Sequence, residues 1–404
     1  MKKLHRNIFF GLIACLEKVF FQKTRASQAL LKIINSNPKW GKRDRSTITD
    51  CFYSCIRWKS KYEYFIGEKF VVINQDDLIK LIGVWLTLND FNISNYIEYE
   101  GFDSKKILNN SKKIINDPVI SFSIPDWMDQ IGNTELPNTW IKEIESLNRP
   151  GKVSIRVNRI QISRNKLQNL LSNYSIETKI DSKYPDALIL LTKKNILKNP
   201  LYLKGFFEIQ DANSQLIAPY TLVEPNMTVI DACSGAGGKA LHLASLMRNK
   251  GEIIAMDIKP NKLKELSKRA IRNKVNIIKP LLINETDTLE EYFSSADRIL
   301  IDSPCSGVGT LKRNPELKWR LSKDFINNIM ESQIKLLEKF SRLLKPNGKI
   351  VYATCSIFPC ENEKQISKFL KSDTGSSFIL EEEIAYSTIN SDFNGFYSAR
   401  LMRK

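Results

Sequence analysis

Two cysteines are the residues of this chain whose types and spacing point most directly to chemistry. Cys305 lies in "RILIDSPCSGVG" and Cys355 lies in "KIVYATCSIFPCENE", and each follows an apolar run typical of a buried strand. Because the carboxyl ends of neighbouring parallel strands meet at one edge of a sheet, we expect both thiols to face one cleft. A thiolate is a nucleophile that can form and release a covalent intermediate, although packing of two small buried thiols explains the bare pair equally well.

A reaction that needs two thiols is methylation of a pyrimidine at carbon 5. This carbon is a poor nucleophile in cytosine, but a thiolate that adds at carbon 6 makes it enamine-like and able to attack a sulfonium methyl group. A base must then remove the proton at carbon 5, and the thiol must be expelled. Asp302, three residues before Cys305, can hydrogen-bond the polar edge of the ring and help to protonate nitrogen 3.

A glycine-rich turn, "DACSGAGGK" (residues 231–239), follows an earlier apolar run. Glycines let backbone amides and the start of a helix approach a ligand closely. Asp257 ends the next apolar run, where a carboxylate can accept hydrogen bonds from ribose hydroxyls. The pattern predicts an adenosine-bearing cofactor. Gly235, Gly237 and Ala240 also satisfy G-x-G-x-x-A, so NAD remains an alternative at this point.

The elements that must hold these residues alternate from about residue 211 onward. The segments "MTVID", "GEIIAMDI", "NIIKPLLIN", "DRILID" and "KIVYAT" are predicted strands separated by helical stretches, which indicates an α/β fold with a doubly wound, mostly parallel sheet. Residues 116–210 predict a small α+β module, with strands in "KVSIRVNR" and "DALILLT" and a helix in "SRNKLQNLLSNY". Residues 1–115 show helical spacing, which continues through Cys15 and so favours a core helix over a lipoprotein signal.

The composition limits the class of partner and the compartment. The 404 residues carry a formal charge of +17, an excess that favours a polyanionic partner such as nucleic acid. Seven cysteines without a Cys-x-x-Cys pair, and only two histidines, argue against a disulfide framework or a metal site. The sequence has no apolar run of about 18 residues, so we expect no membrane span. We therefore expect a cytoplasmic, metal-free protein with reduced thiols, acting as a monomer.

Four ordered motifs carry a resemblance to a known family. The runs "DACSGAGGK", "DSPCSGVGTLKRNPELKW", "YATCSIFPCENE" and "NGFYSARLMRK" together resemble the RsmB/NOL/Sun family of RNA cytosine-5 methyltransferases, which use S-adenosylmethionine. "FEIQDANSQLIAP" is similar to the entry into that family's catalytic domain. The resemblance is greatest to the bacterial RsmB branch, which acts on 16S ribosomal RNA. It implies a NusB-like helical domain over residues 1–115, an RRM-like module over 116–210 and a Rossmann-like class I methyltransferase domain over 211–404.

The resemblance also implies a role for individual residues. Cys355 would be the nucleophile, Cys305 would help to release the product, and Asp302 would lie between cofactor and base with support from Lys239. Where the family has an acid after the third strand, Asn284 lies closest, with Asp287 as the alternative. Ala236 stands where the family commonly has proline. The full set implied to bind the cofactor is Cys233, Ser234, Gly235, Ala236, Gly237, Gly238, Lys239, Asp257, Asn284 and Asp302.

A basic segment with one tryptophan follows Cys305 and is predicted to bind RNA. Its residues are Lys312, Arg313, Lys318, Trp319 and Arg320. Cationic side chains can contact phosphates and an indole can stack on a base, whereas a solvated loop with a packed tryptophan is the alternative. Because a paired base must leave its stack to reach a buried thiol, an unpaired cytidine is the expected substrate.

Four other functions compete with cytosine-5 methylation of ribosomal RNA. A tRNA or DNA cytosine-5 methyltransferase could use the same thiols, and in the DNA enzyme the Pro-Cys thiol of Cys305 would attack. A non-catalytic RNA-binding assembly factor could keep the same fold. An NAD oxidoreductase would share the glycine turn but has no need for two thiols.

Overall fold

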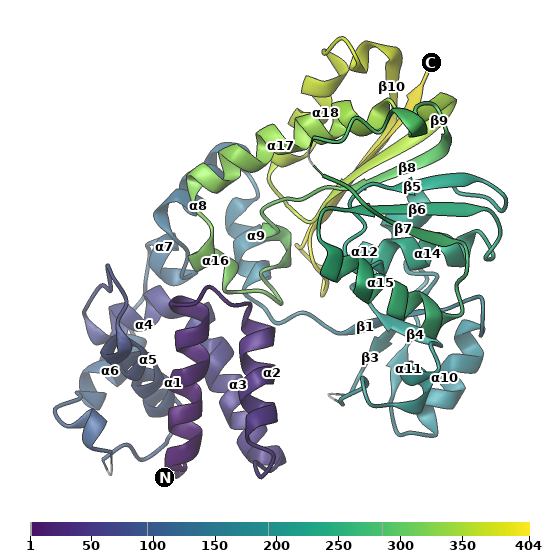
Figure 1. The fold of residues 1–404 in the computed structure, drawn as a ribbon. Helices are drawn as coiled ribbons and strands as arrows, with labels where there is room; N and C mark the ends of the chain where they lie inside the picture. The colour runs from purple at the N-terminus through teal and green to yellow at the C-terminus, as the bar shows by residue number, and fades with distance from the viewer. Residues whose placement is uncertain (1, 95, 193, 285) are drawn as a thin grey trace. The chain divides into compact units, whose positions relative to one another are not determined.

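The computed structural model describes residues 2–94, 96–192, 194–284 and 286–404, and the chain divides into two compact units (Figure 1). The first unit comprises Met1–Arg149 and Thr310–Lys323, and the second comprises Pro150–Gly309 and Asp324–Lys404. The chain therefore leaves the second unit after Gly309, contributes a short segment to the first unit, and returns at Asp324.

The first unit is helical in its described residues, as predicted. Its α1 helix runs without interruption through Cys15, which is fully buried, and Cys51 and Cys55 are likewise buried among apolar side chains. All three thiols therefore serve packing, which agrees with the prediction of a core helix over residues 8–20. The α-helices of this unit are α1 (Arg6–Phe20), α2 (Ala26–Ser36), α3 (Lys42–Arg57), α4 (Lys59–Ile66), α5 (Gln75–Leu88), α6 (Ser104–Ser111), α7 (Pro118–Ser121), α8 (Asp126–Glu135), α9 (Trp140–Leu147) and α16 (Leu317–Arg320).

A four-stranded antiparallel sheet opens the second unit, in the order β2-β3-β1-β4. Its elements are β1 (Ser154–Val157), α10 (Arg164–Ser172), β2 (Thr178–Lys179), β3 (Ala187–Leu190), α11 (Pro200–Leu203) and β4 (Phe207–Ile209). The strands predicted in "KVSIRVNR" and "DALILLT" and the helix between them are present. The predicted boundary at residue 116 differs from this division, because α7, α8 and α9 group with the first unit.

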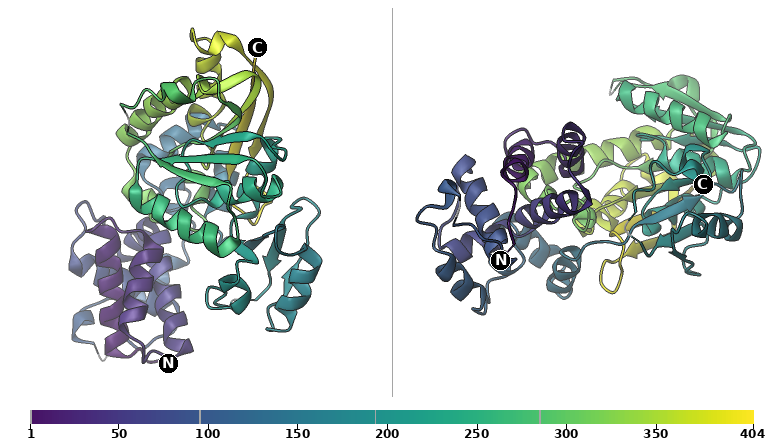
Figure 2. Two further views of the ribbon diagram at one scale, coloured as in Figure 1. Left: turned by 45° about the vertical axis from the view of Figure 1, so that its right-hand side comes forward. Right: turned by 90° about the horizontal axis from the view of Figure 1, so that it is seen from below.

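A seven-stranded sheet forms the centre of the second unit, in the order β10-β11-β9-β8-β5-β6-β7, with helices on its faces (Figures 1 and 2). The strands β5, β6, β7, β8 and β9 pair in parallel, whereas β11 and β10 are antiparallel additions at one edge. This arrangement confirms the predicted α/β, Rossmann-like fold. Its elements are α12 (Ala212–Gln215), α13 (Ile217–Tyr220), β5 (Thr228–Asp231), α14 (Gly238–Leu246), β6 (Glu252–Asp257), α15 (Pro260–Asn273), β7 (Ile278–Leu282), β8 (Ala296–Asp302), α17 (Lys323–Ser341), β9 (Leu344–Thr354), α18 (Glu363–Leu370), β10 (Phe378–Tyr386) and β11 (Phe396–Arg403).

The register of the parallel strands brings the predicted functional residues to one edge of the sheet. Asp231 is the last residue of β5, Asp257 of β6 and Asp302 of β8, and Asp302 is in register with Ala353 of β9. Ligands of open α/β sheets bind outside this carboxyl edge. Among the described residues, no helix combines the length and apolar character needed to cross a bilayer.

Candidate active site at the carboxyl edge of the sheet

The structure brings Cys305 and Cys355 into direct contact. Their Sγ atoms are 3.3 Å apart, and the backbone N–H of Cys355 donates to the Cys305 Sγ at 3.3 Å. The reason is local, because each cysteine follows the end of one of two adjacent parallel strands, β8 and β9. The hydrogen bond with Cys355, together with burial, raises the pKa of Cys305 well above its usual value. Cys305 is therefore a protonated thiol that can donate to the sulfur of Cys355.

A buried glutamate beneath the two cysteines was missed by the sequence analysis. Glu361 is fully buried, and its carboxylate accepts from the backbone N–H of Ser306 at 2.7 Å, from the hydroxyl of Ser306 at 2.5 Å and from the hydroxyl of Ser356. Gln333 donates to it as well, at 3.2 Å. Ser306 and Ser356 directly follow the two cysteines, so one carboxylate fixes both cysteine loops relative to each other.

A glycine joins the same two loops on the other side. The backbone N–H of Gly309 donates to the carbonyl of Cys355 at 3.0 Å, and its carbonyl accepts from the N–H of Gly395 at 2.8 Å. A Cβ atom at Gly309 would lie 2.4 Å from the carbonyl oxygen of Gly395, which is shorter than any tolerable contact. Only glycine therefore fits where these three segments meet.

Lys239 and Asp302 form an ion pair beside the thiols. The Nζ of Lys239 lies 2.6 Å from the carboxylate of Asp302, and Lys239 is buried at 9% exposure. Burial alone would lower the pKa of Lys239, but the carboxylate of Asp302 outweighs it and the pKa is raised, with a smaller contribution from Cys355. A fixed ammonium near Cys355 can stabilise a thiolate there.

The glycine turn adopts the backbone that its sequence predicts. Gly235 and Gly237 have φ values of +52° and +80°, in the left-handed region that favours glycine, and a Cβ on Gly237 would approach Leu266 to 2.6 Å. Asp257 accepts from the backbone N–H of Gly235 and from that of Lys259, each at 2.8 Å. The turn and the second strand are therefore held together by one carboxylate.

A cavity of about 630 Å³ lies in front of this turn. Five predicted residues line it, namely Cys233, Gly235, Asp257, Asn284 and Asp302. Both polar and apolar side chains contribute, and the volume is in the range of ordinary cofactor sites. The carboxylate of Asp257 and the apolar walls suit the ribose and base of an adenosine, and Asp302 lies toward the cysteines. The residues present therefore fit S-adenosylmethionine.

The cavity distinguishes the two residues proposed after the third strand. Asn284 lines the cavity, whereas Asp287 lines a different hollow and accepts from the backbone N–H of Asn284 at 2.7 Å. Ser234, Ala236, Gly237 and Gly238 form the turn behind the lining residues. The sequence analysis predicted helical stretches between the strands but missed the contribution of α17 to the cavity, because helical spacing does not indicate which ligand a helix faces. The lining residues from α17 are Ile329, Ser332, Lys335, Leu336, Lys339 and Phe340.

The basic segment after Cys305 differs from its prediction. Lys312, Lys318 and Trp319 were predicted to contact RNA, but they are built into the first unit. Lys318 is 1% exposed, Lys312 is buried and donates to the hydroxyl of Ser146 at 2.9 Å, and Trp319 packs against the helical core. Burial contradicts the prediction of RNA contacts for Lys312 and Lys318, whereas Trp319 is only partly buried and its RNA contact stays a prediction. Arg320 is exposed, and Arg313 is half-buried.

Helix ends explain why a lysine is buried here. The Nζ of Lys318 donates to the carbonyls of Arg57, Phe122 and Ser123 at 3.0–3.1 Å and to the side-chain oxygen of Asn148 at 2.7 Å. These residues lie at the carboxyl ends of α3, α7 and α9. Carbonyls there lack partners within their own helix and carry partial negative charge, so an ammonium satisfies them.

Two family models match parts of this chain. The family described as 16S rRNA methyltransferase RsmB/F matches residues 220–394, and the RsmF/B-like ferredoxin-like domain matches residues 124–197. The chain is 30% identical over 294 residues to the ribosomal RNA small subunit methyltransferase B of Shewanella oneidensis, covering 70% of this chain and 68% of the relative. It is 34% identical over 274 residues to the probable ribosomal RNA small subunit methyltransferase B of Synechocystis, covering 64% and 60%.

Solved structures share the fold. The crystal structure of PH0851 has a TM-score of 0.84 at 24% identity and covers 99% of this chain and 100% of that chain. NSun6 from Pyrococcus horikoshii, solved with the S-adenosylmethionine analogue SFG, has a TM-score of 0.63 at 19% identity and covers 69% and 98%. The chain therefore belongs to the RsmB/Sun family of RNA methyltransferases, enzymes that use S-adenosylmethionine.

Proposed function

We propose that this enzyme methylates carbon 5 of an unpaired cytidine in the RNA of the small ribosomal subunit, through a covalent bond between Cys355 and the base. The observation that carries the proposal is the 3.3 Å contact between the sulfurs of Cys305 and Cys355, next to the cavity lined by Asp302. The names of the matched relatives favour small-subunit ribosomal RNA as the substrate. An S-adenosylmethionine enzyme has no use for the nicotinamide cofactor that the glycine pattern left open.

The first covalent step belongs to Cys355. Its thiolate, beside the Lys239 ammonium, donates an electron pair to carbon 6 and forms a carbon–sulfur bond. The π electrons of the ring move toward nitrogen 3 and carbon 5, and the Lys239–Asp302 pair hydrogen-bonds the polar edge of the ring where negative charge collects. When bound, S-adenosylmethionine supplies a sulfonium methyl group that this carbon 5 can accept.

The second step belongs to Cys305. The hydrogen bond with Cys355, the largest cause of the raised pKa of Cys305, ends once Cys355 has bonded to carbon 6, and the Cys305 thiol then releases its proton to solvent. Its sulfur takes the proton from carbon 5, the electron pair of that C–H bond restores the C5–C6 double bond, and the Cys355 thiolate leaves. The proton ends on Cys305, so one methyl group enters and one proton departs. The cycle therefore ends as it began, with Cys305 a thiol and Cys355 a thiolate.

Paired substitutions test the division of labour between the cysteines. Cys355→Ala is expected to abolish incorporation of labelled methyl groups into unmethylated small-subunit RNA. Cys305→Ala is expected to accumulate a protein–RNA adduct that survives denaturing electrophoresis. Cys360→Ala is the matched control, because Cys360 lies in the same segment and should retain activity.

Three outcomes would contradict the proposal. If Cys355→Ala forms the stable adduct and Cys305→Ala does not, the attacking sulfur is the one used in the DNA-enzyme alternative. If bisulfite sequencing of the product finds no protected cytidine, the methyl group enters another atom. Full turnover of both variants would make the thiol mechanism wrong altogether.

A further inference from the structure

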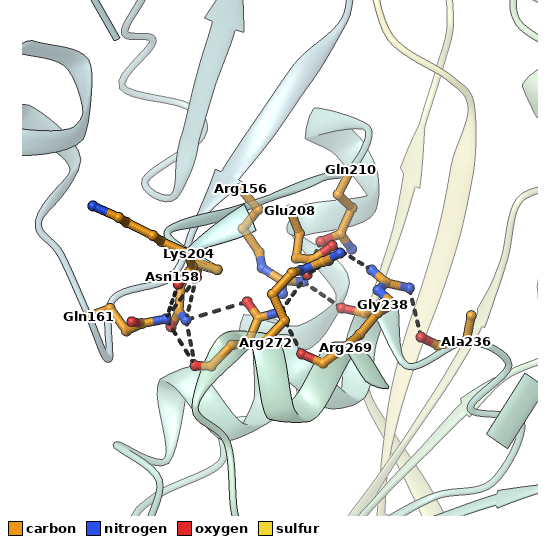
Figure 3. A network of polar contacts seen from close by, with 12 residues as sticks. Arg156, Asn158, Gln161, Lys204, Glu208, Gln210, Ala236, Gly238, Arg269 and Arg272 are labelled. Atoms are coloured by element: carbon orange, nitrogen blue, oxygen red, sulfur yellow. Dashed lines mark hydrogen bonds and ion pairs between the residues drawn. The ribbon is translucent and has the colours of Figure 1, made fainter. Parts of the chain in front are cut away.

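Two arginines contact the backbone of the glycine turn (Figure 3) and do not line the cavity. Arg156, on β1 of the small antiparallel sheet, donates from Nη1 to the carbonyl oxygen of Gly238 at 2.5 Å. Arg269, on α15, donates from Nη1 to the carbonyl oxygen of Ala236 at 2.7 Å. Both acceptors are backbone atoms of the turn, so the contacts act on its shape whatever the side chains are.

A glutamate of the same small sheet orients one of these arginines. Glu208 on β4 is 3% exposed, and its carboxylate lies 3.0 Å from the Nη2 of Arg269 and also pairs with Arg272. Burial opposes the charge of Glu208, but the two arginines hold its pKa below the ordinary value. Arg156 and Glu208 are register partners on neighbouring strands, so both contacts come from one place in the small sheet.

A second link fixes the helix that carries Arg269. The side-chain amide of Asn158 donates to the carbonyls of Asn273 and Gly205, each at 2.9 Å, and the amide of Asn273 donates to Glu208 at 2.5 Å (Figure 3). Asn273 is the last residue of α15. The small sheet therefore holds both the carboxyl end of α15 and the arginine that reaches from α15 to the turn.

The charge of Arg156 survives its burial. Burial lowers the pKa of Arg156 to about 10, with Glu208 acting in the opposite direction, so the guanidinium is charged at neutral pH. A second acceptor, the side-chain oxygen of Gln210 at 2.5 Å, helps to hold it. Because a peptide group is planar, fixing the carbonyl of Gly238 also fixes the N–H of Lys239, the residue that pairs with Asp302.

We propose that the small antiparallel sheet sets the affinity for S-adenosylmethionine, with Arg156 and Arg269 as positioning residues of the cofactor turn. This inference rests on the proposed placement of the cofactor at residues 233–239. It gives the sheet a role in cofactor binding that is separate from any contact with RNA.

Isothermal titration of the full-length protein with S-adenosylmethionine tests the inference. Arg156→Met and Arg269→Met each remove the hydrogen-bond donors but keep an apolar stem. Each is expected to weaken binding of S-adenosylmethionine by about tenfold, because residues that orient the groups contacting a ligand have effects of this size. Arg272→Met is the matched control, because Arg272 shares Glu208 but makes no described contact with the turn. Its affinity should stay within about twofold of the wild type.

The readouts separate positioning from general destabilisation. The KM for S-adenosylmethionine should rise in the two variants while the affinity for RNA stays unchanged, and Arg269→Lys should recover part of the loss. If Arg156→Met does not fold, the partly exposed Arg269 provides the decisive variant. Equal weakening by Arg272→Met, or unchanged affinity in Arg269→Met, would overturn the inference.

A further variant separates failure of this inference from failure of the proposed cofactor site. Asp257→Asn should lose most binding of S-adenosylmethionine if residues 233–239 and Asp257 hold it. Normal binding by Asp257→Asn would refute the site itself. Loss in Asp257→Asn with normal binding in Arg156→Met and Arg269→Met would refute only the role of the small sheet.

Discussion

Two buried lysines, one in each unit, show how the same side chain serves different ends. Lys239 in the glycine turn pairs with the carboxylate of Asp302, and its pKa is raised. Lys318, in the segment Thr310–Lys323, contacts neutral oxygens at helix ends. Burial lowers its pKa well below the usual value, and the charge of Arg57 adds a smaller effect in the same direction. Both segments were predicted to be functional, but only the first lies at the candidate active site.

The difference shows that the charge of the contacting group, rather than burial alone, decides whether the pKa of a buried lysine is raised or lowered here. Burial disfavours the charged form of both lysines, and only a counter-charge reverses the effect. Lys239 is held protonated beside the carboxylate of Asp302, whereas Lys318 donates hydrogen bonds to oxygens at three helix ends. Glu361 resembles Lys318 in this respect, because its described hydrogen bonds come from neutral hydroxyl, amide and backbone groups.

Removing the charge of Glu361 should produce the largest change. Glu361→Gln places an amide against donors, and we expect kcat to fall by about 100-fold, because small displacements of reacting groups have effects of this size. The affinity for S-adenosylmethionine should stay within about twofold, since Glu361 does not line the cavity. Single-turnover methylation and cofactor titration measure the two quantities.

The matched control is Glu363→Gln, a substitution of the same kind two residues away on a partly exposed position. It should leave kcat near the wild-type value. A normal kcat in Glu361→Gln would mean that the cysteine loops hold their geometry without this carboxylate.

Removing the charge of Lys318 should affect stability rather than catalysis. Lys318→Met leaves buried carbonyls without a donor, and we expect the unfolding free energy of the first unit to fall by about 3 kcal/mol. All six tryptophans lie in the segments 1–149 and 310–323, so urea unfolding followed by tryptophan fluorescence reports on this unit.

Arg320→Met is the control, because Arg320 is exposed, and its stability should change by less than about 0.5 kcal/mol. If Lys318 bound a phosphate instead, Lys318→Met would leave stability intact and reduce the salt dependence of RNA binding. That result would mean that Lys318 contacts RNA, as the sequence predicts.

Raising the pH above neutral should change the stability contributed by the two lysines in opposite directions, by amounts smaller than the effects above. Lys239 has a raised pKa, so its stabilisation is complete below the unfolded value of 10.5 and is lost as pH rises through the folded pKa. Lys318 has a lowered pKa, so stability rises as pH increases from its folded pKa toward 10.5. The difference in stability between wild type and variant should therefore shrink with pH for Lys239→Met and grow for Lys318→Met.

Urea unfolding at several alkaline pH values checks these signs. Tryptophan fluorescence follows the first unit for Lys318→Met. Circular dichroism reports on both units, so for Lys239→Met the second unit is followed by the part of its transition that fluorescence does not show. The same sign for both lysines would mean that Asp302 does not control Lys239.

Much of the second unit could be predicted from the sequence because its signals are local. Apolar runs ending in Asp231, Asp257 and Asp302 marked three strands, and glycines at 235 and 237 marked a turn that needs left-handed backbone. The two cysteines followed from the same pattern, since adjacent parallel strands end at one edge. The antiparallel strands β10 and β11 were not predicted as strands, because their pairing depends on β9 rather than on their own spacing.

What the sequence by itself determined is the order of strands and turns and the chemical groups at their ends, because these depend on neighbours a few residues apart. Only the tertiary structure decided which charges are buried and what they face. Lys318 meets Arg57 across 261 positions, and Arg156 meets Gly238 across 82. Glu361 reaches Ser306 across 55 positions. Burial and hydrogen-bond partners arise from such distant contacts, which residue type and local spacing do not predict.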